Sequence, residues 1–347
     1  MRRIILCLCA VLLLGTQALA AEAQQVRDAV PEQAEQLLDG QTDSFSDGLR
    51  TILENVFPAL SGAVRVSLWT AGVMLAAVFL CALAGGSGGL DPARIAAAVC
   101  ICTAGLAQMR ELSGAGSQAL AEMRSFADVL LPAMSVSTAV SGGVTASAAI
   151  YAGTGLFSDV LMHFMDALLL PAVYGYVALH MARALCANEL LTRLARLVKW
   201  CFQSGVKAIL FVFTGYLTVT GLVTGSTDAT VLKAAKLTLS GVVPVVGNMI
   251  SDASETVIVG AAAIRNSVGI LGMLAVIAIC IGPFLRTAVQ FLVLKLASAA
   301  AGAMDQRPLL ELMDAVAEAT GFLMSMLAAQ ALMLLISCLC YLKVAAA

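Results

Sequence analysis

Long apolar stretches alternate with short polar or glycine-rich interruptions along most of the chain. An α-helix needs about 20 mostly apolar residues to cross the hydrocarbon core of a bilayer. Stretches that approach or reach this length lie at residues 64–84, 93–109, 156–181, 206–223, 268–283 with a continuation to 297, and 321–342. The pattern predicts an all-α fold, a polytopic helical membrane protein with about six to seven transmembrane helices.

A seventh stretch, residues 129–150, is apolar but rich in glycine and in side chains that carry a hydroxyl group. Such residues allow helices to pack closely inside a membrane, and they also suit a re-entrant segment buried among neighbouring helices. We favour a re-entrant or surface-lying segment here. A full crossing would move the main basic cluster of the chain to the outer side of the membrane, against the usual distribution of basic residues.

That basic cluster consists of Arg183, Arg193, Arg196 and Lys199. Between residues 183 and 200 the leucines gather on one helical face and the charged residues on another, which predicts a basic amphipathic helix. Such a helix lies at an anionic membrane surface, docks onto a cytoplasmic partner, or packs within its own protein. Because cytoplasmic loops collect Lys and Arg, the cluster is expected to face the cytoplasm.

A second, shorter amphipathic helix is expected after Pro308. Its polar face carries Glu311, Asp314 and Glu318, and its opposite face carries leucine, methionine and valine. Neither amphipathic helix resembles a substrate-binding site.

The first 20 residues have the three parts of a secretory signal peptide. An arginine pair at 2–3 precedes an apolar run over 4–14 and a small-residue cleavage site at 18–20. An uncleaved anchor is the alternative, but the apolar run is short for one. Residues 21–63 then form an acidic extracytoplasmic segment, with eight carboxylates against two arginines, and residues 64–347 form the membrane domain.

The composition agrees with a membrane protein, since 60% of residues are hydrophobic and 12% are charged, against roughly 25% charged in a soluble domain. The cysteine pairs 100/102 and 338/340 lack the spacing of zinc ligands. The chain has no Gly-x-x-x-x-Gly-Lys-Ser/Thr loop, so any energy source belongs to a partner. No cofactor, metal or nucleic-acid partner is expected.

A glycine-rich run at residues 85–89 formally matches the Gly-x-Ser-x-Gly pattern of hydrolases and the Gly-x-Ser-Gly signature of intramembrane rhomboid proteases. The hydrolase pattern needs a strand-turn-helix setting, whereas these glycines follow an apolar helix. A run of glycines between helices is more typical of a flexible loop. We therefore expect no catalytic residues and a protein that is not an enzyme.

Asp159, His163 and Asp166 are spaced to lie on one face of an apolar helix. Ionisable groups at membrane depth are costly and usually face an interior or a wet cavity, which makes this set a candidate proton or ion path. Internal hydrogen bonds, with Asp159 near the membrane edge, are the alternative. An independent secondary transporter that uses these carboxylates is therefore a second functional hypothesis.

The least generic segment is the interruption at residues 241–257. Pro244 and Gly247 break regular structure, and Asp252 followed by Glu255 predicts a capped helix start at about residue 252. This segment, with the stretches at 227–236 and 265–270 and the triplet at 305–307, closely resembles the stage III sporulation protein AE family. The resemblance is continuous over about residues 218–318. Its candidate motif or assembly residues are Pro244, Gly247, Ser251, Asp252, Glu255, Asp305, Gln306 and Arg307.

The resemblance implies a role in endospore formation by a Gram-positive bacterium. Members of this family belong to a channel or secretion-like assembly encoded by one sporulation operon, in the mother-cell membrane that surrounds the forespore. The implied partners are an ATPase and ring-forming membrane proteins of that operon and, indirectly, a forespore membrane protein. The assembly supports late forespore gene expression, and the family brings no catalytic residues to this chain.

Overall fold

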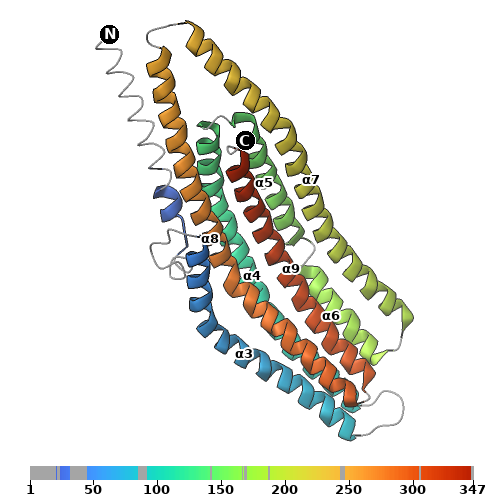
Figure 1. Ribbon diagram of the computed structural model, residues 1–347. Helices are drawn as coiled ribbons and strands as arrows, with labels where there is room; N and C mark the ends of the chain where they lie inside the picture. The colour runs from blue at the N-terminus through green and yellow to red at the C-terminus, as the bar shows by residue number, and fades with distance from the viewer. Residues whose placement is uncertain are drawn as a thin grey trace.

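The computed structural model describes residues 21, 24–31, 45–84, 92–140, 143–165, 167, 170–186, 188–242, 247–304 and 306–344, with side chains left undescribed across 221–267. Helices dominate this part of the chain (Figure 1). In order they are α3 (Phe45–Ala84), α4 (Pro92–Val140), α5 (Val144–Phe164), α6 (Leu170–Leu185), α7 (Glu189–Val242), α8 (Gly247–Ala301), the short 3₁₀ helix η2 (Gly302–Met304) and α9 (Arg307–Val344). The signal-peptide prediction falls outside the described residues.

The long helices form one up-and-down bundle around α9 (Figure 1). Helices α3, α5, α6 and α8 run in one direction, and α4, α7 and α9 run in the other. Two contacts show the antiparallel pairing of α8 with α9, since Lys295 pairs with Asp314 and the Cys280 thiol donates to the Leu327 carbonyl oxygen. Helix α9 contacts α4, α5, α6, α7 and α8, which explains why most of its side chains are buried.

Six helical segments of the described chain are long and apolar enough to cross a membrane, which confirms an all-helical, polytopic protein. The segments are Leu60–Ala84, Pro92–Val140, Val144–Phe164, Glu189–Thr220, Val268–Met304 and Arg307–Lys343. The continuation of the fifth apolar stretch to residue 297 is confirmed by the unbroken α8. At 54 and 55 residues, α7 and α8 measure about 80 Å at 1.5 Å per residue. They therefore extend beyond the roughly 30 Å hydrocarbon core.

The predicted span at 156–181 is wrong, because α5 ends at Phe164 and α6 begins at Leu170. Pro171 lies in the first turn of α6, where its missing backbone N–H is tolerated, whereas a proline inside a continuous helix would remove a hydrogen bond of that helix. The third crossing candidate is therefore α5.

The stretch at 129–150 is likewise divided, since α4 ends at Val140 and α5 begins at Val144. Its re-entrant course remains a prediction, although Ser137 and Ser147 are buried as a re-entrant segment requires.

Neither predicted amphipathic segment is a separate helix. Residues 183–200 are shared between the end of α6 and the start of α7, and the break between them is capped where the Leu190 N–H donates to Asn188 Oδ1 at 2.9 Å. The segment after Pro308 is the first part of the continuous α9.

The helix start predicted at about residue 252 is also wrong, because α8 begins at Gly247. The capping pair thus lies inside a helix.

Buried hydrogen bonds join α5 to α9 along the bundle. Thr154 Oγ1 lies 2.6 Å from Ser337 Oγ, Gln330 Nε2 donates to Ser158 Oγ at 3.3 Å, and the Tyr341 hydroxyl donates to the Ser147 carbonyl oxygen at 3.4 Å. Polar side chains shared between helices help to hold them together where no water is available to compete.

Candidate functional site

An ion-pair cluster connects α9 to three neighbouring helices. Glu311, Asp314 and Glu318 lie on one face of α9 through their i, i+3, i+7 spacing. Each pairs with a basic residue on another helix, in the contacts Arg183–Glu311 at 2.7 Å, Lys295–Asp314 at 2.9 Å and Lys199–Glu318 at 2.6 Å. The cluster therefore fixes the mutual positions of α6, α7 and α8 around α9.

Glu318 is the most enclosed acid of the cluster, with its side chain 24% exposed. Its second oxygen accepts a 2.5 Å hydrogen bond from the Tyr176 hydroxyl, and the Tyr176 ring packs against Phe322 and His180. Burial and the adjacent Glu318 carboxylate raise the pKa of Tyr176, so its hydroxyl remains a donor. Burial and the nearby Arg183 lower the pKa of His180. Its imidazole is therefore neutral at pH 7.

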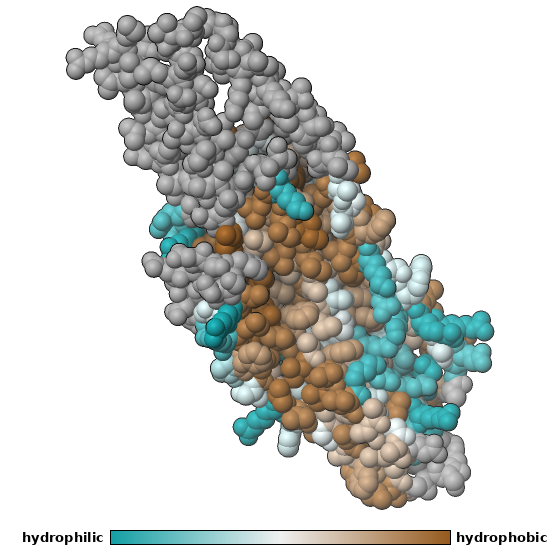
Figure 2. All heavy atoms as spheres, viewed as in Figure 1, coloured by the Kyte–Doolittle hydropathy of each residue, from teal (hydrophilic) through white to brown (hydrophobic). Residues whose placement is uncertain are grey.

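The predicted basic residues divide into two groups. Arg183 and Lys199 take part in the cluster, whereas Arg193 and Arg196 lie exposed on the first turns of α7. Exposed Leu190, Leu194, Leu197 and Trp200 accompany them on α7. Figure 2 shows hydrophilic side chains gathered on this flank of the bundle beside a broad apolar surface. The exposed pair remains a candidate partner or lipid surface.

A cavity of about 420 Å³ lies beside the ion-pair cluster, between α7, α8 and α9. We call it the lysine cavity, because Lys199, Lys207 and Lys295 line it together with Glu318. Its remaining walls include Gln203 and Ser325 and the apolar side chains of Val206, Phe291, Phe322 and Met324. The cavity thus combines cationic groups with an apolar wall.

The predicted face at residues 159–166 is only partly assembled. Asp159 forms an ion pair with Arg124 of α4, and both side chains line a cavity of about 530 Å³ with Asp128 and Ser158. His163 is exposed on α5, and Asp166 lies outside the described residues. Within the described chain no three His, Cys, Asp or Glu side chains converge as metal ligands would.

The motif residues that the structure describes lie near the two ends of α8. Pro244 and Asp305 fall outside the described residues, and Gly247, Ser251, Asp252 and Glu255 lie on α8 in a part whose side chains are not described. Gln306 connects α8 to α9 and also reaches α3. Its backbone carbonyl accepts the N–H groups of Leu309 and Leu310, and its side-chain oxygen accepts the Cys81 thiol at 4.0 Å. Arg307 begins α9. The described part of the triplet is therefore a helix junction.

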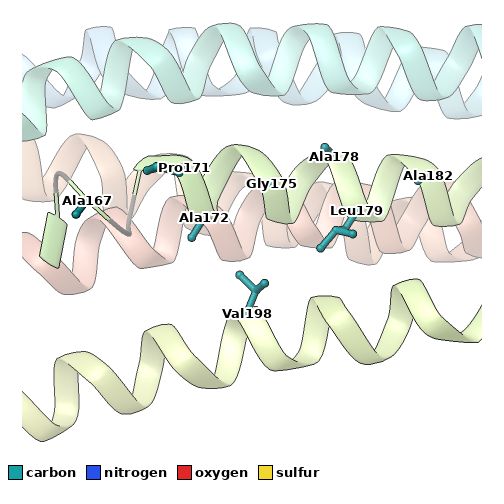
Figure 3. Close-up of a pocket in the computed structure, with 8 residues that line it drawn as sticks. All are labelled: Ala167, Pro171, Ala172, Gly175, Ala178, Leu179, Ala182 and Val198. Carbon is teal, nitrogen blue, oxygen red and sulfur yellow. The ribbon is translucent and has the colours of Figure 1, made fainter.

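A third hollow lies between α6 and α7, with a volume of about 590 Å³ (Figure 3). Ala172, Gly175, Ala178 and Ala182 of α6 line it, opposite Val198 of α7. Small residues leave space between the two helices. The lining carries no charged or nucleophilic side chain, so this hollow is a packing feature without chemistry of its own.

Comparisons with known proteins point in one direction. A family model described as stage III sporulation protein AE matches residues 54–345. Stage III sporulation protein AE of Bacillus subtilis (strain 168) is 26% identical over 228 residues, which cover 64% of this chain and 55% of that relative. The match thus spans about half the length of the curated relative. No solved structure matches the chain.

Proposed function

Because the chain belongs to the stage III sporulation protein AE family, we propose that it is a membrane subunit of a channel or secretion-like complex that acts in sporulation. Membership implies the sporulation role, and the match over residues 54–345 is the observation that carries the proposal. The proposed assembly lies between mother cell and forespore and supports late forespore gene expression. In it this chain is a non-enzymatic component, and an ATPase of the same operon supplies the energy.

The bundle supports a role as a rigid membrane component. Its ion pairs and buried hydrogen bonds join helix to helix, so they fix a scaffold. The exposed Arg193 and Arg196 give α7 a basic surface outside the ion-pair cluster. On this proposal that surface faces the mother-cell cytoplasm, where the ATPase and ring-forming membrane proteins assemble.

The proposed topology begins outside the cytoplasm, after cleavage of the signal peptide at residue 20. Crossings by α3, α4 and α5 then bring the chain to the cytoplasmic side before Arg183, as the basic residues favour. The acidic segment before residue 64 would face the space between the two membranes. In this arrangement residues 129–150, at the end of α4 and the start of α5, add no crossing of their own between the second and third crossings.

Deletion and complementation test the proposal. In a spore-forming host that carries this gene, deletion is expected to arrest sporulation after engulfment and to leave vegetative growth unchanged. Reintroduction of the wild-type gene restores heat-resistant spores, and late forespore reporter activity returns with them. The Asp252→Asn, Glu255→Gln double variant tests the motif. Full sporulation at normal protein levels would show that these two residues have only a local structural role in the helix.

A secondary transporter is the second candidate, and the cavity with Arg124 and Asp159 favours it. Conversion of Asp159 to Asn removes one charge of that pair. Loss of growth on a particular nutrient in the deletion strain, with normal spore formation, would replace the channel proposal with this one.

A further inference from the structure

The lysine cavity holds an excess of positive charge. Lys199, Lys207 and Lys295 line it with a single acid, Glu318, which gives the lining a net formal charge of +2. Asp314, which pairs with Lys295 at 2.9 Å, lowers the local sum to +1. No carboxylate among the described side chains pairs with Lys207, which is exposed on α7. The site therefore attracts an anion.

Two lysines of α7 lie along one side of the helix. Lys199, Gln203 and Lys207 follow one another at i, i+4 and i+8, so the two ammonium groups and the amide border the same groove. Ammonium groups bind phosphate as point charges, and an amide N–H adds a hydrogen bond to a phosphate oxygen. This side of the cavity suits a phosphate group in particular.

The other side of the cavity is apolar. Val206 lies on α7, Phe291 on α8, and Phe322 and Met324 on α9. A free inorganic ion gains nothing from such a wall. An anion that carries a hydrocarbon chain buries apolar surface there while its phosphate meets the lysines.

The cavity also lies where charged residues end along two helices. After Glu318, α9 has no charged residue until Lys343, and after Lys207 the chain has none until Asp228. These uncharged stretches have the length of about 30 Å or more that a hydrocarbon core requires. Trp200, which is 67% exposed, lies on the charged side of this boundary, and Phe211, which is 81% exposed, lies on the apolar side. Tryptophan at such a boundary is typical of a membrane interface.

From these observations we propose that the lysine cavity binds the phosphate headgroup of an anionic phospholipid, with an acyl chain along the partly exposed Phe291 and Met324. Basic pockets between transmembrane helices bind anionic headgroups elsewhere. Such a lipid would reinforce the contact of α7 with α8 and α9 beside the ion-pair cluster. The inference requires a membrane-embedded bundle, and it holds whether or not the sporulation complex has been correctly assigned.

Lipid binding to the purified full chain in detergent tests the proposal, with native mass spectrometry as the readout. Lys207→Gln removes a cation that takes part in no described ion pair. We expect phosphatidylglycerol to bind this variant about fivefold more weakly, the effect of one basic residue near an anionic surface. Lys207→Arg keeps the charge and should restore binding. Arg110→Gln removes an exposed charge of α4 that does not line the cavity, and it should leave affinity unchanged.

Two competitor measurements define the source of the phosphate. Phosphatidylcholine, which has no net charge, is expected to bind weakly to the wild type and to every variant. Excess inorganic phosphate is expected to leave bound phosphatidylglycerol in place, since it cannot use the apolar wall. Equal affinity of wild type and Lys207→Gln for phosphatidylglycerol would overturn the proposal. Displacement by inorganic phosphate would overturn the assignment of a lipid.

Discussion

At the residue scale, the polar side chains of the bundle serve mainly to connect helices. The sequence indicated an acidic face at Glu311, Asp314 and Glu318, but it could not show what that face contacts. Arg183 and Lys199 lie 128 and 119 positions before the acids that they contact, and Lys295 lies 19 positions before its acid. Such pairing depends on how whole helices pack, so local spacing carries no signal for it.

The Asp159 face illustrates the same limit. Its residues were identified from i, i+4, i+7 spacing, which assumes that they act together on one helix. In the bundle Asp159 instead pairs with Arg124, which lies on α4. A neighbouring helix thus supplies the counter-charge that the spacing rule could not anticipate.

The protonation of His180 gives a prediction at this scale. Burial and Arg183 lower its pKa below the ordinary 6.5, while Lys199 also opposes protonation and Glu311 and Glu318 favour it. The unfolded chain therefore binds a proton at a higher pH than the folded chain. The stabilising contribution of neutral His180 is complete above pH 6.5 and falls as the pH drops towards the lower folded pKa.

Chemical unfolding in detergent between pH 7.5 and about pH 5 measures this effect. We expect the free energy of unfolding to decline less steeply in His180→Gln than in the wild type. His163→Gln is the matched control, since the sequence has two histidines and His163 is exposed on α5. An identical pH profile for His180→Gln and the wild type would contradict the prediction.

At the element scale, apolar length was a good guide to helices and a poor guide to their ends. Five of the predicted apolar stretches lie within single long helices. The stretch at 156–181 failed because hydrophobicity continues through the break between α5 and α6. Pro171 was the available signal there. Conversely, charged residues at 183–200 and 309–318 suggested separate helices, although longer helices pass through both regions.

The contact of α5 with α7 gives a prediction at this scale. Gly153 faces the ring of Tyr216, and a Cβ atom at this position would lie 2.2 Å from Tyr216 Cε1. The ring is held in place because its hydroxyl donates to the Ala149 carbonyl oxygen at 3.0 Å and Phe157 packs beside it. Gly153→Ala should therefore destabilise the bundle by about 1–3 kcal/mol, the usual cost of overpacking.

Gly155 offers a control on the same helix, since a Cβ atom there meets no other atom within 4 Å. Gly155→Ala should leave the melting temperature unchanged or raise it slightly, because alanine is the better helix former by roughly 0.5–1 kcal/mol. Equal melting temperatures for the two variants in the same detergent would show that α5 and α7 do not approach as closely as described.

At the scale of the whole molecule, the apolar segments of α3 and α7 are offset along the bundle. Thr70 of α3 contacts Gln108, and the next residue, Met109, contacts Thr320 of α9. On α7, Lys199 contacts Glu318. The exposed Trp69 and Trp200, neighbours of Thr70 and Lys199, thus lie at similar levels of α9. From there α3 continues towards Gln306 at the start of α9, whereas α7 continues towards the level of Tyr341.

A bilayer that covers both apolar segments must therefore cross the bundle obliquely. Tilted crossing is common among membrane helices and accommodates segments longer than the hydrocarbon core. It also reconciles two sequence-based expectations, an extracytoplasmic start of α3 and a cytoplasmic start of α7, with the similar levels of Trp69 and Trp200. In an upright bundle these two tryptophans would lie on the same side of the membrane.

Labelling from outside the cell distinguishes the two arrangements. Arg65 and Arg193 are exposed on α3 and α7, one turn or two from these tryptophans, so each is replaced singly by Cys in a variant without native cysteines. With an oblique crossing, a membrane-impermeant maleimide should label Arg65→Cys in intact cells and Arg193→Cys only after the membrane is permeabilised. Labelling of both from outside would favour an upright bundle. It would also place the basic start of α7 on the outer side and so remove the proposed cytoplasmic surface for the ATPase.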